Sequence, residues 1–353
     1  MNRTLTVSST SGSYPVTFVD DLRDGLKKTG QKNAHLLLDS HIGKMYKKID
    51  STAFLSVYEF DARESNKNLT EVQNYAQFLI KNGIKKSHQV VVIGGGLIQD
   101  IGSFTAHILL RGINWVFIPT TLLSVADSCI GSKSGINVGA YKNQVGAFHP
   151  PKEIYIYHGF LKTLPAQEIQ NGIGEILKHA LIKGGSSYQS ITENLSHIQQ
   201  DKVKGEQVIY ESLLIKKEIV EEDEFEKDIR RLLNYGHSFG HALEGYTKNK
   251  IPHGIGVSIG MDIANFVSMK RKLITQEQFD EISRVLRTYI PYDQIQIDDI
   301  DLYLKFLSRD KKIIGDKLYA ILCEGIGTIK ITPIKIDKEL GDQITEYCQS
   351  FKR

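Results

Sequence analysis

The sequence predicts an α/β domain followed by a mainly α-helical domain. Three observations predict this order. Short β-branched runs alternate with helical patterns from residue 35 to residue 118, and helical patterns dominate after residue 161. The chain has 353 residues, which is more than one hydrophobic core usually supports. We therefore predict one domain at residues 1–160 and a second at residues 161–353.

Period-two alternation and short apolar runs predict strands in the first half of the chain. These are residues 4–9, 14–19, 35–40, 53–60, 89–94, 113–118 and 153–157. Apolar residues at helical spacing predict helices at residues 20–29, 68–82 and 97–108. Strands that alternate with helices favour a mostly parallel sheet that is covered on both faces.

Composition and charge exclude several classes of protein. The 44 basic residues exceed the 41 acidic ones by only 3, which is too few to predict a nucleic-acid partner. Three widely spaced cysteines form neither a disulfide framework nor a zinc knuckle, which favours a reducing cytoplasm. The N-terminus lacks the apolar core of a signal peptide, and polar residues interrupt the most apolar stretch, residues 108–125.

A glycine triplet, Gly94 to Gly96, follows a predicted strand and opens a predicted helix. Such a turn lets the pyrophosphate of a dinucleotide approach the backbone and the helix N-terminus. The match to the dinucleotide pattern is incomplete because Gln99 stands at the third glycine position, and Asp100 would oppose a phosphate beside it. A tight structural turn is the alternative. Asp39 ends an earlier strand and suits either nucleotide hydroxyls or a helix cap.

Residues 127–143 are rich in glycine and in side-chain donors, among them Lys133, Lys142 and Asn143. This composition predicts a flexible loop that suits a phosphorylated ligand, or else a plain solvated loop.

The second half of the chain contains amphipathic helices with charged faces. One predicted helix, residues 172–182, places Glu175, Lys178 and His179 opposite an apolar stripe, as a site or a solvated face would. A second, residues 207–225, carries Lys216 and Lys217, which by default are surface charges. Residues 309–312 form a basic turn before a predicted hairpin at 318–323 and 328–332.

Two histidines four residues apart, His237 and His241, share one face of a predicted helix with Glu244. Another histidine, His253, begins the next helix. Glu175, His237 and His253 together would form a three-ligand site of the type that zinc uses in catalysis, which leaves His241 for polar or proton-transfer work. A pair of surface histidines is the alternative, and the sequence does not show that the three ligands converge.

Several ordered motifs resemble one family over nearly the whole chain. They are Gly94–Asp100, Arg111-Gly112, Pro119–Leu123, Asp127-Ser128, Lys142-Asn143, Thr163–Pro165, Glu175–Lys178, Asn234–Ala242 and His253-Gly254. Together they resemble the 3-dehydroquinate synthases, which belong to the sugar phosphate cyclases. The chain departs from the family pattern at Gln99, at Ser132 and Ser134, at Asp228, and at Ile255, where the family usually has glutamate. These departures suggest a divergent branch.

The resemblance implies a dehydroquinate synthase-like fold. This fold has an N-terminal nucleotide-binding α/β domain, a C-terminal helical metal-binding domain and an active site in the cleft between them. It also implies a cytoplasmic homodimer with NAD and with Zn²⁺, or Co²⁺, as cofactors. The implied metal ligands are Glu175, His237 and His253. The implied NAD contacts are Asp39, Glu64, Lys67, Gly94, Gly95, Gly96, Asp100, Thr120, Thr121, Lys142 and Thr163.

The resemblance also implies which residues contact the substrate. Phosphate contacts fall on Lys133, Asn143, Asn234 and His241, with Arg111 reaching in from a second subunit. Carboxylate contacts fall on Lys216 and Arg230, hydroxyl contacts on Asp127 and Lys178, and a further contact on Lys311 or Lys312.

The implied reaction belongs to the shikimate pathway of aromatic amino acid biosynthesis. It converts 3-deoxy-arabino-heptulosonate 7-phosphate into 3-dehydroquinate and phosphate by transient NAD-dependent oxidation, phosphate elimination, re-reduction and intramolecular aldol closure. Three alternatives remain: a sister cyclase acting on sedoheptulose 7-phosphate or glucose 6-phosphate, a metal-dependent polyol dehydrogenase, and a non-catalytic relative. Lys216 and Arg230 favour the carboxylate-bearing substrate over the carboxylate-free sugars.

Overall fold

The computed structural model describes residues 3–47, 49–139, 141–248, 250–290, 296–310 and 312–350, so the predicted contact Lys311 lies outside the described residues. Backbone contacts divide the chain into two compact units. The first unit is Met1–Leu164 with Gln199–Glu206 and Lys216–Phe225. The second is Pro165–Ile198, Gln207–Ile215 and Glu226–Arg353. The boundary at residue 160 stays a prediction.

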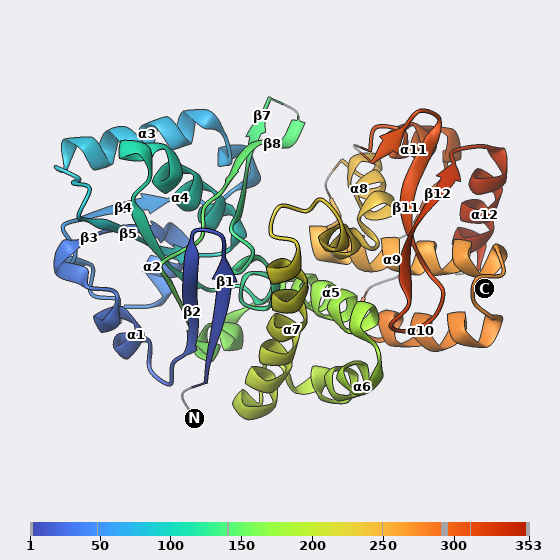
Figure 1. Cartoon of the computed structure of the whole chain (residues 1–353), viewed down its shortest axis with the longest axis horizontal. Helices are drawn as coiled ribbons and strands as arrows, with labels where there is room; N and C mark the ends of the chain where they lie inside the picture. The colour runs from blue at the N-terminus through green and yellow to red at the C-terminus, as the bar shows by residue number, and fades with distance from the viewer. Residues whose placement is uncertain are drawn as a thin grey trace. The chain divides into compact units, whose positions relative to one another are not determined.

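A seven-stranded sheet forms the centre of the first unit, in the order β1-β2-β9-β6-β5-β3-β4 (Figure 1). Its strands are β1 (Thr4–Ser9), β2 (Gly12–Phe18), β3 (Ala34–Asp39), β4 (Ser56–Phe60), β5 (Gln89–Gly94), β6 (Asn114–Pro119) and β9 (Glu153–Ile156). Only the pairing of β1 with β2 is antiparallel. The prediction of a mostly parallel sheet is therefore confirmed.

Helices cover both faces of this sheet, as predicted (Figure 1). They are α1 (Leu22–Lys28), α2 (Ser40–Met45), α3 (Leu69–Lys81) and α4 (Gly96–Ile108). Successive strand residues point to opposite faces, so Leu36 packs in the core with α1 and α2 while Leu37 faces α4. A Cβ on Gly102 of α4 would lie 2.5 Å from Val92 Cγ2, so glycine permits the close packing of α4 on β5.

The prediction of a flexible loop at residues 127–143 is wrong. Residues Ser124–Ser128 form a helical turn, and β7 (Lys133–Val138) pairs antiparallel with β8 (Tyr141–Phe148). The hairpin is anchored because the Gly135 N–H donates to Asp100 Oδ1 (3.1 Å) and Lys67 Nζ donates to Asn143 Oδ1 (2.7 Å). Polar strand residues gave the sequence no alternating apolar pattern, so the hairpin was not predicted.

The second unit is mainly helical, as predicted (Figure 1). Its helices are α5 (Ala166–Lys183), α6 (Gly185–Asn194), α8 (His237–Tyr246), α9 (His253–Lys270), α10 (Gln276–Tyr289), α11 (Ile300–Leu307) and α12 (Lys338–Gln349). A small sheet of β10 (Ile313–Ile314), β11 (Lys317–Cys323) and β12 (Ile329–Lys335) contains the predicted hairpin. No helix in the described ranges is long and apolar enough to cross a bilayer.

One helix, α7 (Lys202–Glu222), contributes segments to both units and starts five residues before the predicted start at residue 207. Asp201 caps it by accepting hydrogen bonds from the backbone N–H groups of Val203 and Lys204. Asp is a favoured residue at this position because its side chain satisfies donors that the first helical turn leaves unpaired.

A histidine buried in the first unit, His35, predicts a loss of stability in acid. His35 bonds through Nδ1 to Ser56 Oγ (2.8 Å) and through Nε2 to His88 Nδ1 (3.1 Å). Burial, with a smaller effect of His88, lowers the pKa of His35 to about 4. Below pH 6.5, His35 therefore binds a proton in the unfolded chain but not in the folded chain. The free energy of unfolding consequently falls as the pH is lowered from about 6.5 to about 4.

When the pH is lowered from 7 to 4.5, we expect the protonation of His35 to lower the free energy of unfolding by on the order of 2 kcal/mol. Urea unfolding at both pH values measures it. His35→Gln should lose less stability on acidification than the wild type, while the control His41→Gln, on the surface, should behave as the wild type does. An equal pH dependence in His35→Gln and wild type would refute the assignment.

Candidate active site and metal centre

Glycine contacts bring the three helices α5, α8 and α9 of the second unit close together. A Cβ on Gly174 of α5 would lie 2.2 Å from the carbonyl oxygen of Gly254 of α9. A Cβ on Gly260 of α9 would lie 2.0 Å from the carbonyl oxygen of Gly236, which immediately precedes α8. No side chain fits at these crossings, so the backbones approach directly. The residues next to glycines at such crossings include Glu175, His237 and His253.

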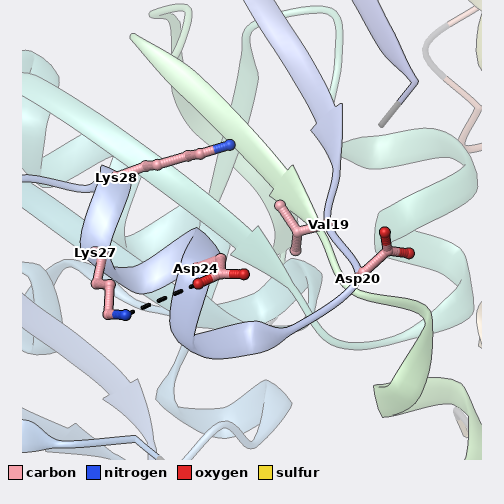
Figure 2. Close-up of a pocket in the computed structure, with 5 residues that line it drawn as sticks. All are labelled: Val19, Asp20, Asp24, Lys27 and Lys28. Carbon is pink, nitrogen blue, oxygen red and sulfur yellow. Dashed lines mark ion pairs between the residues drawn. The ribbon is translucent and has the colours of Figure 1, made fainter. Parts of the chain in front are cut away.

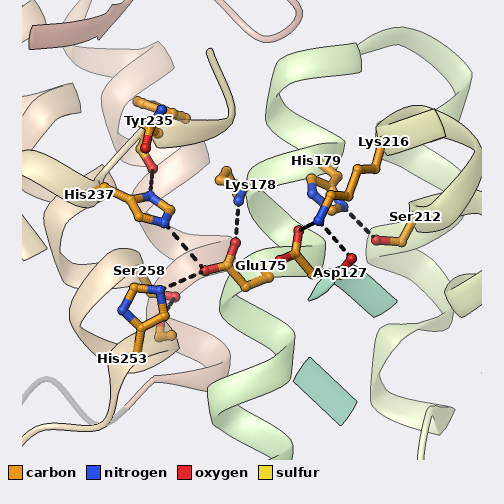
Figure 3. A network of polar contacts seen from close by, with 12 residues as sticks. Asp127, Glu175, Lys178, His179, Ser212, Lys216, Tyr235, His237, His253 and Ser258 are labelled. Atoms are coloured by element: carbon orange, nitrogen blue, oxygen red, sulfur yellow. Dashed lines mark hydrogen bonds and ion pairs between the residues drawn. The ribbon is translucent and has the colours of Figure 1, made fainter. Parts of the chain in front are cut away.

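The three predicted metal ligands converge in this unit (Figure 3). Glu175 Oε1 lies 3.8 Å from His237 Nε2 and 3.5 Å from His253 Nε2. Donor atoms that hold zinc tetrahedrally at about 2.0–2.1 Å are separated by roughly 3.3 Å. The carboxylate and the two imidazoles therefore fit a divalent metal ion such as zinc or cobalt.

The alternative that Glu175, Lys178 and His179 form a solvated face is wrong, because all three side chains are buried. Glu175 Oε2 forms an ion pair with Lys178, and His179 Nδ1 bonds to Ser212 Oγ at 2.8 Å (Figure 3). The sequence could not show this burial, because a polar face that lines a site has the same spacing as one that faces water.

The second ring nitrogen of each candidate ligand histidine has a partner. His237 Nδ1 lies 3.2 Å from the backbone carbonyl oxygen of Tyr235, and His253 Nδ1 lies 2.9 Å from Glu244 Oε1. When a metal is bound, a proton on each Nδ1 donates to these oxygens, which leaves each Nε2 lone pair directed at the position between the ligands.

His241 offers a competing third ligand, since one ligand atom from each of His237, His241 and His253 lies within 4.8 Å of the others. Its ring lies edge to face with His237, at 5.3 Å between centroids. Across the described ranges, no hydrogen bond holds the His241 ring, unlike the other two. A ligating histidine normally has such a partner, so this difference favours Glu175 as the third ligand.

The three imidazoles have different affinities for a proton. Burial lowers the pKa of His237 well below its usual value, and burial together with the charge of His253 lowers the pKa of His241 to about 4. Burial opposes a charge on His253 as well, but the hydrogen bonds that its ring donates to Glu175 and Glu244 outweigh this effect and raise the pKa to about 10. The His241 side chain is itself exposed, and its lowered pKa favours the neutral form, which can accept a proton.

The carboxyl edge of the first unit's sheet contains the predicted cofactor residues. In this sheet β4 lies on one side of β3 and β5 lies on the other, so the strand order reverses between β3 and β5. Such a reversal is the topological switch point at which parallel α/β sheets bind nucleotides. Asp39 is the last residue of β3, and Gly94 is the last residue of β5. A Cβ on Gly94 would lie 2.3 Å from Ile98 Cγ2 and 3.1 Å from Asp39 Cβ, and one on Gly95 would lie 2.9 Å from Thr121 Cγ2. Only glycine fits in this turn.

Polar contacts arrange the other predicted cofactor residues in this unit. Asp39 accepts from the His41 N–H (2.8 Å), so the helix-cap role is observed. Asp100 pairs with Lys67 (3.0 Å), which offsets the charge that would oppose a phosphate beside the glycine turn. Three further contacts are Thr120 N to Gly94 O (3.0 Å), Thr163 Oγ1 to Tyr46 OH (2.7 Å) and Asn137 Nδ2 to Glu64 Oε1 (2.7 Å).

Gln99 does not disrupt the turn, because its side chain is buried against Ser128. Gln99 Nε2 donates to the Ser128 carbonyl oxygen, and Ser128 Oγ donates to Gln99 Oε1, both at 2.7 Å. The neighbouring Asp127 is held by Lys216, whose Nζ lies 3.0 Å from Asp127 Oδ1 and 2.7 Å from its carbonyl oxygen (Figure 3). The default interpretation of Lys216 as a surface charge is therefore wrong, since it is buried.

The remaining predicted substrate contacts are distributed over both units. In the first unit, Lys133 Nζ lies 6.0 Å from the Phe148 ring centroid, Lys142 is exposed, and Arg111 is exposed in a left-handed turn (φ 59°). In the second unit, Arg230 is buried, Asn234 Nδ2 lies 2.5 Å from Glu226 Oε1, and Lys312 pairs with Asp310 at 2.9 Å. The sequence analysis missed Glu226 and assigned no role to Glu244 or Ser128, because isolated polar residues carry no periodic signal.

A hollow on the first unit is lined by Val19, Asp20, Asp24, Lys27 and Lys28 (Figure 2). Its two carboxylates and two ammonium groups offset one another, and Lys27 lies 3.9 Å from Asp24. This balance selects no ligand charge, so we assign the hollow no role.

Comparisons with known proteins identify the family. Residues 57–171 match the model of the 3-dehydroquinate synthase N-terminal region, and residues 172–313 match that of the C-terminal region. The 3-dehydroquinate synthase of Pelagibacter ubique (strain HTCC1062) is 33% identical over 341 residues, 92% of this chain and 93% of the relative. That of Alkaliphilus metalliredigens (strain QYMF) is 37% identical over 270 residues, 76% of each chain.

Solved structures share the fold at lower sequence identity. A 2-deoxy-scyllo-inosose synthase complexed with carbaglucose-6-phosphate, NAD⁺ and Co²⁺ has a TM-score of 0.87 at 23% identity, covering 98% of this chain and 99% of its own. The 2-epi-5-epi-valiolone synthase of Streptomyces hygroscopicus subsp. jinggangensis 5008, with NAD⁺ and Zn²⁺ bound, has a TM-score of 0.86 at 24% identity, covering 97% and 99%. The predicted fold class is confirmed, and the chain belongs to the 3-dehydroquinate synthase family, as its motifs predicted.

Proposed function

We propose that this chain is a 3-dehydroquinate synthase, a carbon–oxygen lyase that converts 3-deoxy-arabino-heptulosonate 7-phosphate into 3-dehydroquinate and phosphate. The observation that carries the proposal is the convergence of Glu175, His237 and His253 in a member of this family. The names of its curated relatives support it, and two structural neighbours bind NAD⁺ together with Zn²⁺ or Co²⁺.

The cofactors and the protein groups have separate tasks in this proposal. When bound, NAD and the metal supply transient redox chemistry and Lewis-acid polarisation of a substrate hydroxyl. Glu175, His237 and His253 hold the metal, while the glycine turn and Asp39 hold NAD. His241, as a neutral imidazole, donates a hydrogen bond to the phosphate through its N–H and can accept a proton at its other ring nitrogen.

Charged and amide groups bind the substrate without forming bonds to it. We assign the phosphate to Lys133 and Asn143 of the first unit, to Asn234 and His241 of the second, and to Arg111 of the second subunit of a homodimer. We assign the carboxylate to Lys216 and Arg230, hydroxyl groups to Asp127 and Lys178, and a further contact to Lys312. Such donors stabilise a phosphate dianion as it leaves, which is an electrostatic task.

One assay compares the candidate substrates. Purified protein with NAD⁺ and Zn²⁺ is incubated with the heptulosonate phosphate, sedoheptulose 7-phosphate, glucose 6-phosphate or a simple polyol, and phosphate and NADH are followed. We expect phosphate from the heptulosonate alone, without lasting NADH, because NAD⁺ is reduced and the NADH is then reoxidised within one turnover.

Other outcomes would replace the proposal. Phosphate from a carboxylate-free sugar would identify a sister cyclase and would leave Lys216 and Arg230 without their assigned partner. Lasting NADH without phosphate would identify a polyol dehydrogenase. Absence of turnover with all four compounds would identify a non-catalytic relative.

A further inference from the structure

Glu244 of α8 is a buried carboxylate that points at a candidate metal ligand. Its side chain is 8% exposed, and its Oε1 lies 2.9 Å from His253 Nδ1 on the neighbouring helix α9. A Cβ on Gly256 would lie 3.4 Å from Glu244 Cγ and 3.5 Å from Oε1, so the carboxylate lies against α9 with ordinary contact distances. The helical spacing placed Glu244 beside His237 and His241, yet its contact is with His253.

A carboxylate on Nδ1 fixes both the tautomer and the orientation of an imidazole. The Nδ1 proton donates to the carboxylate in a charge-assisted hydrogen bond, which is stronger than one to a neutral acceptor. The lone pair then lies on Nε2, which is 3.5 Å from Glu175 Oε1. The Glu244 charge also raises the basicity of the ring, which strengthens its bond to a cation.

His253 depends on such a partner more than His237 does. The His253 side chain is 40% exposed, whereas that of His237 is 13% exposed, so packing alone restrains the His253 ring less. His237 needs only the neutral backbone carbonyl of Tyr235 to orient it. The buried Glu244 carboxylate in turn needs a donor, because a buried charge without one is costly.

We infer that Glu244 is a positioning residue of the metal centre, which holds His253 through Nδ1 so that its Nε2 faces Glu175 and His237. This inference rests on the proposed metal site. Outer-shell partners of metal-ligating histidines typically contribute 10–100-fold to metal affinity.

The test is a metal titration of the full-length apo protein, with no NAD and no substrate. Co²⁺ binding is followed by its visible absorption, and Zn²⁺ affinity is measured by competition with a chelator. Glu244→Met keeps the side-chain length but removes the acceptor, and we expect metal affinity to fall about 10–100-fold. Glu244→Gln keeps a neutral acceptor and should recover part of this loss.

Two controls separate orientation of His253 from general disturbance of the helix. Ser258→Ala removes a different hydrogen bond near the start of α9, from Ser258 Oγ to the Gly254 carbonyl oxygen (2.9 Å), and should leave metal affinity within about twofold. In a His253→Ala background, Glu244→Met should cause little further loss, because its effect acts through His253.

The outcomes distinguish this inference from the metal site itself. A wild-type protein that binds neither Co²⁺ nor Zn²⁺ would remove the proposed site and the inference with it. A wild type that binds metal, with unchanged affinity in Glu244→Met, would overturn the inference alone. An equal loss in Glu244→Met with and without His253 would also overturn it.

Discussion

Replacing His237 with alanine should cause the protein to lose its bound metal on dialysis, whereas replacing His241 should leave the metal in place and remove most of the activity. His237 Nε2 lies 3.8 Å from Glu175 Oε1 and its Nδ1 is held by the Tyr235 carbonyl, so its loss leaves two ligands. His241 has no such orienting partner within the described residues. Loss of its imidazole should cost about 10²–10⁴-fold in turnover, as expected for a proton-transfer group.

Metal analysis of dialysed protein, together with phosphate release from the heptulosonate, measures both effects. Glu175→Ala serves as the matched variant, because Glu175 and His241 compete for the role of third ligand. We expect Glu175→Ala to lose metal as His237→Ala does. Metal lost in His241→Ala but kept in Glu175→Ala would show that the ligands are the three histidines, and would reassign Glu175 to its ion pair with Lys178.

The elements of the fold followed from local patterns in the sequence. Period-two alternation predicted β1 and β2, and short apolar runs predicted the other strands of the large sheet, because a strand buried on both faces is continuously apolar. The β7–β8 hairpin escaped prediction because its strands carry Lys133, Lys142 and Asn143 and are held by contacts to Lys67 and Asp100 from distant segments. Such contacts have no signature in a local window.

The identities of the proposed metal ligands came from motifs, but their supporting contacts did not. A carboxylate was expected at position 255, where this chain has the buried Ile255. Glu244, nine residues before His253, supplies a carboxylate to that histidine. Sequence spacing placed Glu244 on a helical face without showing which neighbouring helix that face meets. The same reason explains why Lys216 and Glu175 were open to interpretation as surface charges.

Gly260→Ala should separate α8 from α9 and weaken the metal centre. A Cβ at this position would lie 2.0 Å from the Gly236 carbonyl oxygen and 2.6 Å from the Gly240 backbone nitrogen. Both contacts are with backbone, so no side-chain rotation relieves them, and the helices must move apart. Alanine favours the helix by up to about 1 kcal/mol, but overpacking of this kind costs typically about 1–3 kcal/mol and sometimes more.

We therefore expect Gly260→Ala to unfold more easily in urea and to bind Co²⁺ more weakly, because Gly236 immediately precedes His237. Gly256→Ala on the same helix is the matched control. Its added Cβ would lie no closer than 3.4 Å to any neighbour, which is ordinary contact, so its stability should equal or exceed that of the wild type. A Gly260→Ala protein with wild-type stability and metal affinity would show that the α8–α9 crossing tolerates a side chain. In that case the close approach of these helices would not be what fixes the positions of His237 and His253.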